Sequence, residues 1–261
     1  DGVELEDDSD VTTAGAATAT ITIMGTTTGP LGANSAGVLI SSAGNDVTIT
    51  SAAGAILITG EASGTSGNGV KIEAGIGLAI DANGVATVTI IGTGDEAESG
   101  VQIDSPISSE TGAVTIRSED GGSSTDDIIF GAAGDITSTS GLVTIDADNA
   151  GNTADVFMTD GAVIDAGSGL IDIDASVDVT LGGLVTTTGV QINAIVGAII
   201  DGGNTNSDIT AATAALRAET GIGTDADDLD TVSDATTTTL TLAATTDTGD
   251  IHVVNTGHLI I

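Results

Sequence analysis

Three short apolar segments recur in the same order along this chain, separated by stretches rich in glycine and polar residues. One set is 114–116 (VTI), 128–130 (IIF) and 135–137 (DIT), and later sets are 143–145 (VTI), 156–158 (VFM) and 162–164 (AVI), then 171–173 (IDI), 177–179 (VDV) and 184–186 (LVT). A segment this short cannot bury an apolar face by itself, but stacked neighbours can share a continuous core. The repeat therefore predicts a solenoid.

The repeat keeps its segment length while its period varies. Successive anchor residues of the first segment lie 19 to 35 residues apart. They are Ile23, Ile58, Ile90, Ile116, Ile145, Ile173 and Ile192, and the second segment has the anchors Ile40, Ile72, Ile103, Phe130, Met158, Val179 and Ile199. Because surface loops tolerate insertions, we expect the variation to lie in the corners between strands.

Alternation within each segment predicts which side chains enter the core. In Val-Thr-Ile the two outer residues share one face of a strand, so the apolar members are expected to point inward and the threonines outward. The inward set is Val88, Ile90, Val114, Ile116, Val143 and Ile145. Three strands per turn, each paired in parallel with its equivalent one turn away, describe an all-β fold, the parallel β-helix, with about nine turns and a length of about 43 Å. Phe130 is expected to stack over Met158.

The repeat occupies the whole chain and predicts a single β-solenoid domain, 1–261. We expect opening strands in 1–17, regular turns in 18–208, an irregular turn in 209–239 and a last three-strand turn in 240–261, whose strands are 240–242, 251–253 and 259–261. Residues 225–232 indicate either a loop or a short helical corner that begins at Asp225. The absence of an initial methionine suggests a processed product or a segment of a longer polypeptide.

The charge of the chain excludes several classes of partner. There are 38 acidic and 3 basic residues, which gives a formal net charge of −35. Such a surface repels nucleic acids and anionic membranes. No apolar run approaches the roughly 18 residues of a membrane span, so membrane insertion is not expected. The absence of cysteine excludes disulfides and thiol chemistry and leaves the cellular compartment open.

Acidic residues follow the first strand of several turns, and stacking is expected to bring them together. Two carboxylates about 4.8 Å apart repel each other by roughly 0.9 kcal/mol even in water. Calcium prefers several flexible oxygen ligands and would relieve this repulsion. The candidate ligands are Asp95, Glu96, Asp120, Asp126, Asp127, Asp146, Asp148, Asn149 and Asp155. The alternative interpretation is a solvated acidic surface without a cofactor.

The two ends of the predicted coil carry the main functional inference. The end of a β-helix exposes unpaired backbone groups above an apolar core, and proteins normally protect such an edge with charges, proline or a covering segment. Leu259, Ile260 and Ile261 at one end carry no charge, proline or cap, and Val3 and Leu5 at the other lie in what resembles an ordinary strand of the coil. We therefore expect these five residues to form an assembly interface that joins copies head to tail, or joins consecutive segments of a longer chain.

Three stretches near the C-terminal end resemble a known group of proteins. Residues 197–203 (GAIIDGG), 214–223 (AALRAETGIG) and 249–261 (GDIHVVNTGHLII) resemble the very large secreted β-strand-repeat proteins of bacteria, which are similar to filamentous-haemagglutinin-type adhesins. The resemblance covers about the last 70 residues. It implies a right-handed β-helix at the bacterial cell surface or in a biofilm matrix, serving attachment or scaffolding, with extracellular polysaccharide as a further partner.

Two functions then fit the sequence, and three others fit less well. The first is an extracellular structural subunit that stacks into a filament, and the alternative is a spacer stalk within a giant adhesin. A polysaccharide-active enzyme would use carboxylates such as Asp172 and Asp174, but tryptophan and tyrosine, which stack on sugars, are absent, so no enzyme is predicted. Outward threonines do not form a uniform array for ice binding. His252 and His258 lack further ligands for a metal.

Overall fold

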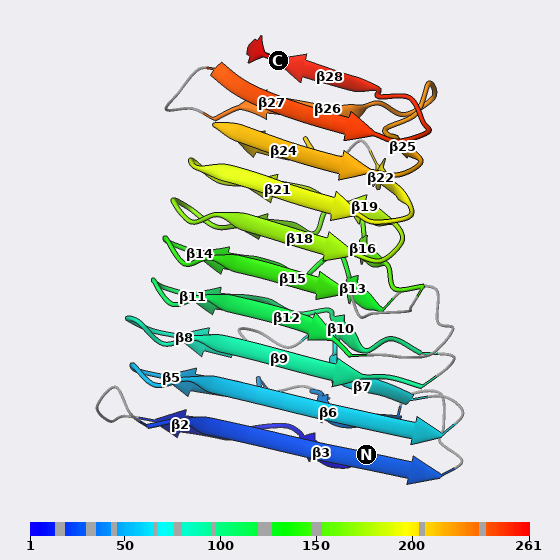
Figure 1. Cartoon of the computed structure of the whole chain (residues 1–261). Coiled ribbons are helices and arrows are strands. Elements are labelled where there is room, and N and C mark those ends of the chain that lie inside the picture. The colour runs from blue at the N-terminus through cyan, green and yellow to red at the C-terminus, as the bar shows by residue number, and fades with distance from the viewer. Residues whose placement is uncertain are drawn as a thin grey trace.

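The chain forms a right-handed coil of parallel β-strands with the two termini at opposite ends (Figure 1). This computed structural model describes residues 1–13, 19–29, 35–42, 46–64, 67–75, 80–95, 98–119, 127–147, 153–203, 207–234 and 239–261. Every strand pair in these residues is parallel, and each strand between the two ends of a sheet pairs with its equivalents one turn above and one turn below. No helix within the same residues is long and apolar enough to cross a membrane. The predicted parallel β-helix is confirmed.

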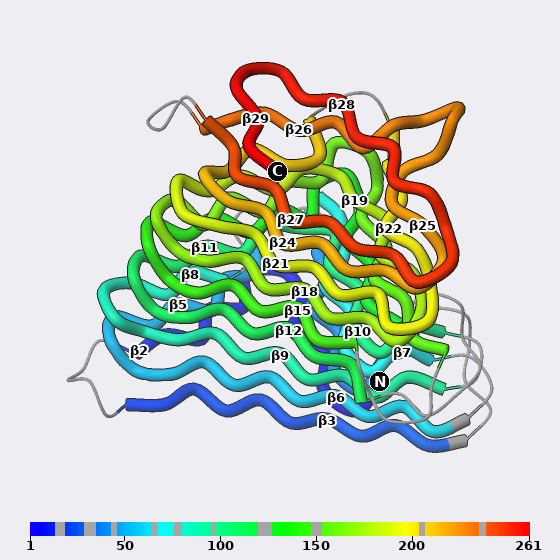
Figure 2. The backbone as a smooth tube through the Cα atoms, turned by 45° about the horizontal axis from the view of Figure 1, so that its top comes forward, coloured from blue at the N-terminus to red at the C-terminus, as the bar shows by residue number. Residues whose placement is uncertain are grey.

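Three sheets form the sides of the coil, and Figure 2 shows their turns stacked one on another. Sheet A contains β1 (Val3–Leu5), β4 (Ser35–Ile40), β7 (Gly67–Ile72), β10 (Val101–Ile103), β13 (Ile128–Phe130), β16 (Val156–Met158), β19 (Val179–Leu181), β22 (Ala198–Asp201) and β25 (Gly221–Ile222). Sheet B contains β2 (Asp10–Thr13), β5 (Thr48–Ser51), β8 (Ile80–Ala82), β11 (Ile107–Ser109), β14 (Ile136–Ser138), β17 (Val163–Asp165), β20 (Gly183–Val185), β23 (Ile209–Ala211), β26 (Leu229–Ser233) and β28 (Val253–Thr256). Sheet C contains β3 (Ile21–Gly29), β6 (Ile56–Gly64), β9 (Val88–Thr93), β12 (Val114–Ser118), β15 (Val143–Ala147), β18 (Ile171–Ala175), β21 (Gly189–Ala194), β24 (Thr213–Ala218), β27 (Thr239–Thr246) and β29 (His258–Ile260).

The register in sheet C confirms every anchor predicted for the first strand. Ile23 pairs with Ile58, and the column continues through Ile90, Ile116, Ile145, Ile173 and Ile192. The side chains of Val114 and Ile116 are fully buried, whereas Thr115 between them is only half-buried. Period-two alternation therefore places one continuous column of branched aliphatic side chains along the core.

In sheet A one predicted alignment is wrong. Ile40, Ile72, Ile103, Phe130 and Met158 stack in the expected order. Val179, however, pairs with Val156 and lies two residues away from the expected position over Met158. A shift by two residues keeps the same side chains in the core, so the apolar pattern alone does not distinguish the two alignments.

The last turns also differ from the prediction. Residues 259–261 were expected to supply the third strand of the last turn, but β29 pairs with β27 in sheet C and therefore begins a further turn. The third position belongs to β28, which pairs with β26. Residues 225–232 form neither a helix nor only a loop, because β26 begins at Leu229 and pairs with β23. The predicted irregular turn thus contains strands in regular register.

One column at the corner where sheet C meets sheet A changes its residue type along the coil. It contains Gly25, Gly60 and Gly92 in the first three turns and Ala147, Ala175, Ala194 and Ala218 in later ones, with Ser118 between the two sets. Glycine is required in the first set because a Cβ on Gly60 would overlap the carbonyl oxygen of Gly69 in β7, and a Cβ on Gly92 that of Gly100 directly before β10. The two sheets therefore meet backbone to backbone, and we call this contact the glycine seam.

Candidate functional site

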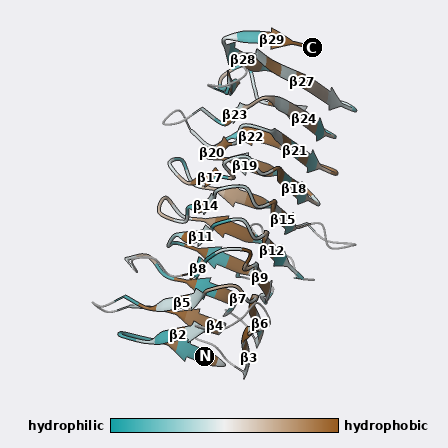
Figure 3. Ribbon diagram, turned by 90° about the vertical axis from the view of Figure 1, so that its left-hand side faces the viewer, coloured by the Kyte–Doolittle hydropathy of each residue, from teal (hydrophilic) through white to brown (hydrophobic). Residues whose placement is uncertain are grey.

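The N-terminal edge of the coil is formed by β1, β2 and β3, each of which pairs on one side only. Val3 and Leu5 point toward the core and are partly buried, as is Val11 of β2. The outward Glu4 has a raised pKa because its side chain lies in hydrogen-bonding contact with Glu6 and is partly desolvated. In Figure 3 the strand β2 is among the most hydrophilic parts of the ribbon. This edge therefore presents apolar side chains inside an acidic rim.

The C-terminal edge is formed by β28 and β29, with Ile251 joined to Ile222 by an isolated parallel bridge. Leu259 and Val253 pack against the core and remain partly exposed. Ile260 points outward and is 55% exposed, and Ile261 is 94% exposed. Of the three residues predicted here, Leu259 is therefore the one that would contact a further turn through the core. The role of all five predicted residues in assembly stays a prediction.

The predicted calcium ligands are only partly visible. Glu96, Asp120, Asp126, Asp148 and Asn149 lie outside the described residues. Among the described side chains, no group of three or more histidine, aspartate or glutamate residues is arranged to hold a metal ion. Asp146 instead lies 3.6 Å from Arg117, measured from Oδ2 to Nε. Calcium binding therefore stays a prediction.

Several carboxylates at the corners have a structural partner that the sequence did not indicate. Asp155 Oδ1 accepts a hydrogen bond of 2.7 Å from the backbone N–H of Asp178, and Asp178 Oδ1 accepts one of 2.6 Å from Ala198. Asp135 Oδ1 accepts one of 2.8 Å from Val163, and Asp95 Oδ2 one of 3.0 Å from Gly67. In each case the acceptor and donor belong to neighbouring turns. Charge-assisted bonds of this kind satisfy backbone groups at the corners, where the sheet ladders stop.

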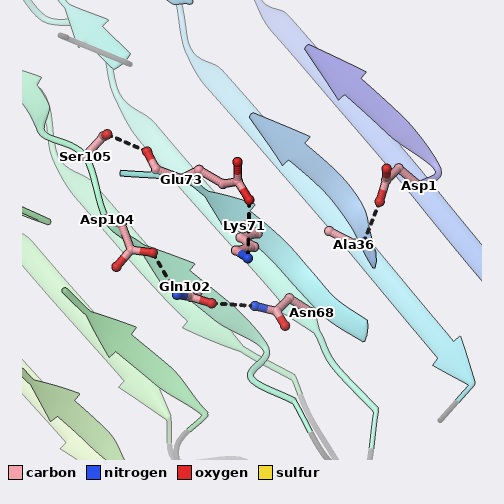
Figure 4. A network of polar contacts seen from close by, with 8 residues as sticks. All are labelled: Asp1, Ala36, Asn68, Lys71, Glu73, Gln102, Asp104 and Ser105. Atoms are coloured by element: carbon pink, nitrogen blue, oxygen red, sulfur yellow. Dashed lines mark hydrogen bonds and ion pairs between the residues drawn. The ribbon is translucent and has the colours of Figure 1, made fainter. Parts of the chain in front are cut away.

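A second polar network lies on the outer surface of sheet A (Figure 4). Asn68 Nδ2 donates to Gln102 Oε1 over 2.9 Å, and Gln102 Nε2 donates to Asp104 Oδ2 over 2.7 Å. Lys71 Nζ lies 3.4 Å from Glu73 Oε1. Burial raises the pKa of Asp104, while Gln102 and the Lys71 charge lower it. The hydrogen bond between Asn68 and Gln102 joins neighbouring turns, so the network stabilises the stack.

A shallow groove on the outer face of sheet C contains the carboxylates considered for catalysis. Asp172 and Asp174 line it together with Asn193 and Arg217. Burial and the neighbouring Asp146 charge raise the pKa of Asp172, and Asn193 Nδ2 donates to Asp174 over 3.3 Å. The alanines at 215 and 243 form its floor and offer no aromatic surface to a sugar.

The two histidines of the chain lie in its last turns, and among the described residues neither belongs to a group of three or more side chains that could hold a metal ion. His252 Nδ1 lies 3.4 Å from Asp225 Oδ1 and 3.9 Å from Asp228 Oδ1, and His258 is exposed on β29.

Comparison with protein-family models, with curated proteins and with solved structures found no match for this chain.

Proposed function

We propose that this chain is a structural β-solenoid whose ends stack head to tail into a filament of the bacterial surface or extracellular matrix. The observation that carries the proposal is the pair of open edges on an all-parallel coil. Among the described residues, β28 and β29 at the C-terminal edge and β2 and β3 at the N-terminal edge belong to the same two ladders, run in the same direction and pair on one side only. A parallel edge of this kind is a template for another strand.

The apolar side chains at the two edges support the same arrangement. Leu259 and Val253 at one end and Val3, Leu5 and Val11 at the other are only partly buried, although they continue core columns. Stacking one end on the other would remove them from water and complete the core between two turns. Because two different surfaces meet, the contact is heterologous and repeats without closing, which produces a fibre.

The acidic surface sets the conditions for assembly. With a formal charge of −35 per chain, two copies repel each other at low ionic strength. Salt at about 0.15 M reduces the screening length to about 8 Å, so that the short-range apolar contact at the edges can dominate. The acidity also keeps the sides of neighbouring rods apart, which favours growth along the axis over lateral aggregation.

Electron microscopy of the isolated chain at physiological salt tests the proposal. We expect unbranched filaments whose length grows with protein concentration and which shorten at low salt. The variant Leu259→Asp, which places a charge at the core-facing position of the last strand, is expected to leave short rods. Ile260→Asp is the matched control, because its side chain points outward, and it is expected to assemble far better.

Two results would overturn the filament proposal. If the unmodified chain gives only single short rods at high concentration and physiological salt, the rival function, a spacer stalk in a longer adhesin, is favoured. If Leu259→Asp and Ile260→Asp assemble equally well, the interface does not continue the core. Melting curves of both variants, which should retain the main unfolding transition, verify that the middle turns are intact.

A further inference from the structure

Two aspartates are buried at the corner that joins sheets A and B near the C-terminal end. Asp201 is the last residue of β22 and is 6% exposed, and Asp208 lies directly before β23 and is fully buried. Burying one ionised carboxylate is already costly, and burying two facing ones is more so. The corner therefore needs something to neutralise the pair.

Each of the two carboxyl groups has one oxygen that is satisfied by the backbone. Asp201 Oδ1 accepts a hydrogen bond of 2.7 Å from the N–H of Gly203. Asp208 Oδ2 accepts one of 2.6 Å from the N–H of Asp230, the second residue of β26 in the next turn. The other oxygens, Asp201 Oδ2 and Asp208 Oδ1, are buried and find no donor among the residues that the structure describes. A side-chain hydrogen-bond interaction between the two carboxyl groups acts to raise the pKa of Asp208 and to lower that of Asp201.

The charged groups that surround this pair are acidic. Asp230 acts on both carboxyl groups and Asp227 on Asp201. Asp160, two turns below, lies against Gly203. No lysine or arginine contributes to either site in the described structure, and no third side chain there converges on the two open oxygens to complete a metal site. A proton held between the two oxygens satisfies both of them at once, because a protonated carboxyl donates where an ionised one can only accept.

We propose that Asp208 Oδ1 and Asp201 Oδ2 share one proton. This shared proton links β22 to β23 across the corner, and we call the linked pair of carboxyl groups the clasp. Asp208 carries the proton and donates a hydrogen bond to the ionised Asp201. The second oxygen of Asp208 accepts the hydrogen bond from the backbone N–H of Asp230 in β26. The clasp therefore connects two strands of one turn with a strand of the next. Loss of the proton leaves two ionised carboxylates facing each other in a buried corner and loosens all three strands.

The protonation behaviour of Asp208 agrees with this geometry. Burial, together with the neighbouring Asp201 and Asp230 charges, raises the pKa of Asp208 to about 8, although the N–H of Asp230 lowers it. The unfolded chain would bind the same proton only below about pH 4. Because the folded state holds the proton at higher pH, the contribution of the clasp to stability is fully present below about pH 4. It falls as the pH rises toward about 8 and stays constant above that.

The test begins with infrared spectroscopy of the unmodified protein, which requires no variant to fold. At pH 6.5 we expect an absorption band of a protonated carboxylic acid, and we expect it to disappear as the pH is raised through about 8. The same band should be absent from the variant Asp208→Asn. A spectrum of the native protein at pH 6.5 without any protonated carboxyl band would overturn the proposal.

Melting temperatures provide the second measurement. In Asp208→Asn the amide donates to Asp201 at every pH, so this variant should melt roughly 5 °C above the native protein at pH 9 and close to it at pH 5. The matched control Asp250→Asn removes an exposed charge from the same end and should keep the native pH dependence. Parallel curves for the native protein and Asp208→Asn would contradict the clasp. So would calcium that stabilises the native protein at pH 6.5 and displaces the acid band, because a cation would then neutralise the pair.

Discussion

The first three turns and the later turns solve the same corner between sheets C and A in different ways. In the early turns the column of Gly25, Gly60 and Gly92 lets sheet C lie directly on the backbone of sheet A, and the strands β3 and β6 continue past it to nine residues. In the later turns alanine occupies the column and the strands end there, as β15 and β18 do at Ala147 and Ala175. Glycine in this column therefore accompanies the two strands that continue well past the corner, and alanine accompanies strands that end there.

This contrast shows how one ladder accommodates turns of different length. The core column of sheet C keeps the same register from Ile23 to Ile192, so the change at the corner does not alter the packing order of the core. The difference is confined to the corner, where close backbone approach excludes a side chain in one region and a small buried side chain fills the space in the other. Stability in each region then depends on a different kind of contact.

The largest effect is expected from Gly60→Ala in the glycine seam. The added methyl group would overlap the carbonyl oxygen of Gly69, a backbone atom that cannot move without separating the two sheets. We expect a loss of about 3 kcal/mol in the free energy of unfolding. Denaturant titration measures this loss, and hydrogen exchange should place the loosening in β3, β6 and β7.

The matched control for this variant is Gly221→Ala in strand β25. A Cβ there would have its nearest neighbour at 3.5 Å, an ordinary contact, and the backbone of Gly221 needs no left-handed conformation. We expect a change below about 0.5 kcal/mol. If both alanine variants have the same stability, the seam is not a close backbone contact and the comparison between the two regions is wrong.

A smaller effect is expected when the comparison is reversed with Ala175→Gly. This change removes a buried methyl group and adds backbone freedom to the unfolded chain, so it should cost about 1.5 kcal/mol. It should not create a seam, because the sheet A strand of this turn, β19, contains no glycine to approach it. Ala243→Gly, on the outer face of β27, should cost less, since the lost methyl group is exposed. A gain in stability for Ala175→Gly would refute the role assigned to the alanine column.

The smallest effects concern the basic residues on the outer faces of the two regions. Arg217 lies 3.9 Å from Asp247 with both side chains about 60% exposed, so Arg217→Met should change the free energy of unfolding by less than about 0.5 kcal/mol. Lys71 in the early turns is only 13% exposed and lies 3.4 Å from Glu73, so Lys71→Met should cost more, about 1 kcal/mol. Thermal melting in low and high salt compares the two, and equal losses would show that burial does not distinguish these pairs.

The sequence was sufficient to predict the core and insufficient to predict the corners. Alternation in Val114, Thr115 and Ile116 and its recurrence identified the fold, the inward residues and the columns of sheet C, because period-two patterns follow directly from strand geometry. The same short apolar pattern serves all three sheets. Residues 259–261 were therefore assigned to the wrong side of the coil, and Val179 to the wrong alignment.

The polar contacts at the corners depend on distances that the sequence does not contain. Asp155 accepts a hydrogen bond from a backbone N–H 23 residues away, and the same separation is 20 residues for Asp178 and 28 for Asp135 and Asp95. The pairing of Asp201 with Asp208 likewise follows from the path of the chain around a corner and not from any motif. Strand β26 was difficult to predict because it follows an aspartate-rich segment. Only one of its two buried residues, Leu229 and Thr231, is apolar.

The constant register has a consequence for the length of the molecule. Val114 pairs with Val143 and Val143 pairs with Ile171, so the chain returns to the same column of sheet C after one rung, between Val143 and Ile171. Deleting or duplicating that rung would shift the distance between the two ends by about 4.8 Å while leaving both ends untouched. The span of the coil therefore changes in fixed increments, one strand spacing for each rung.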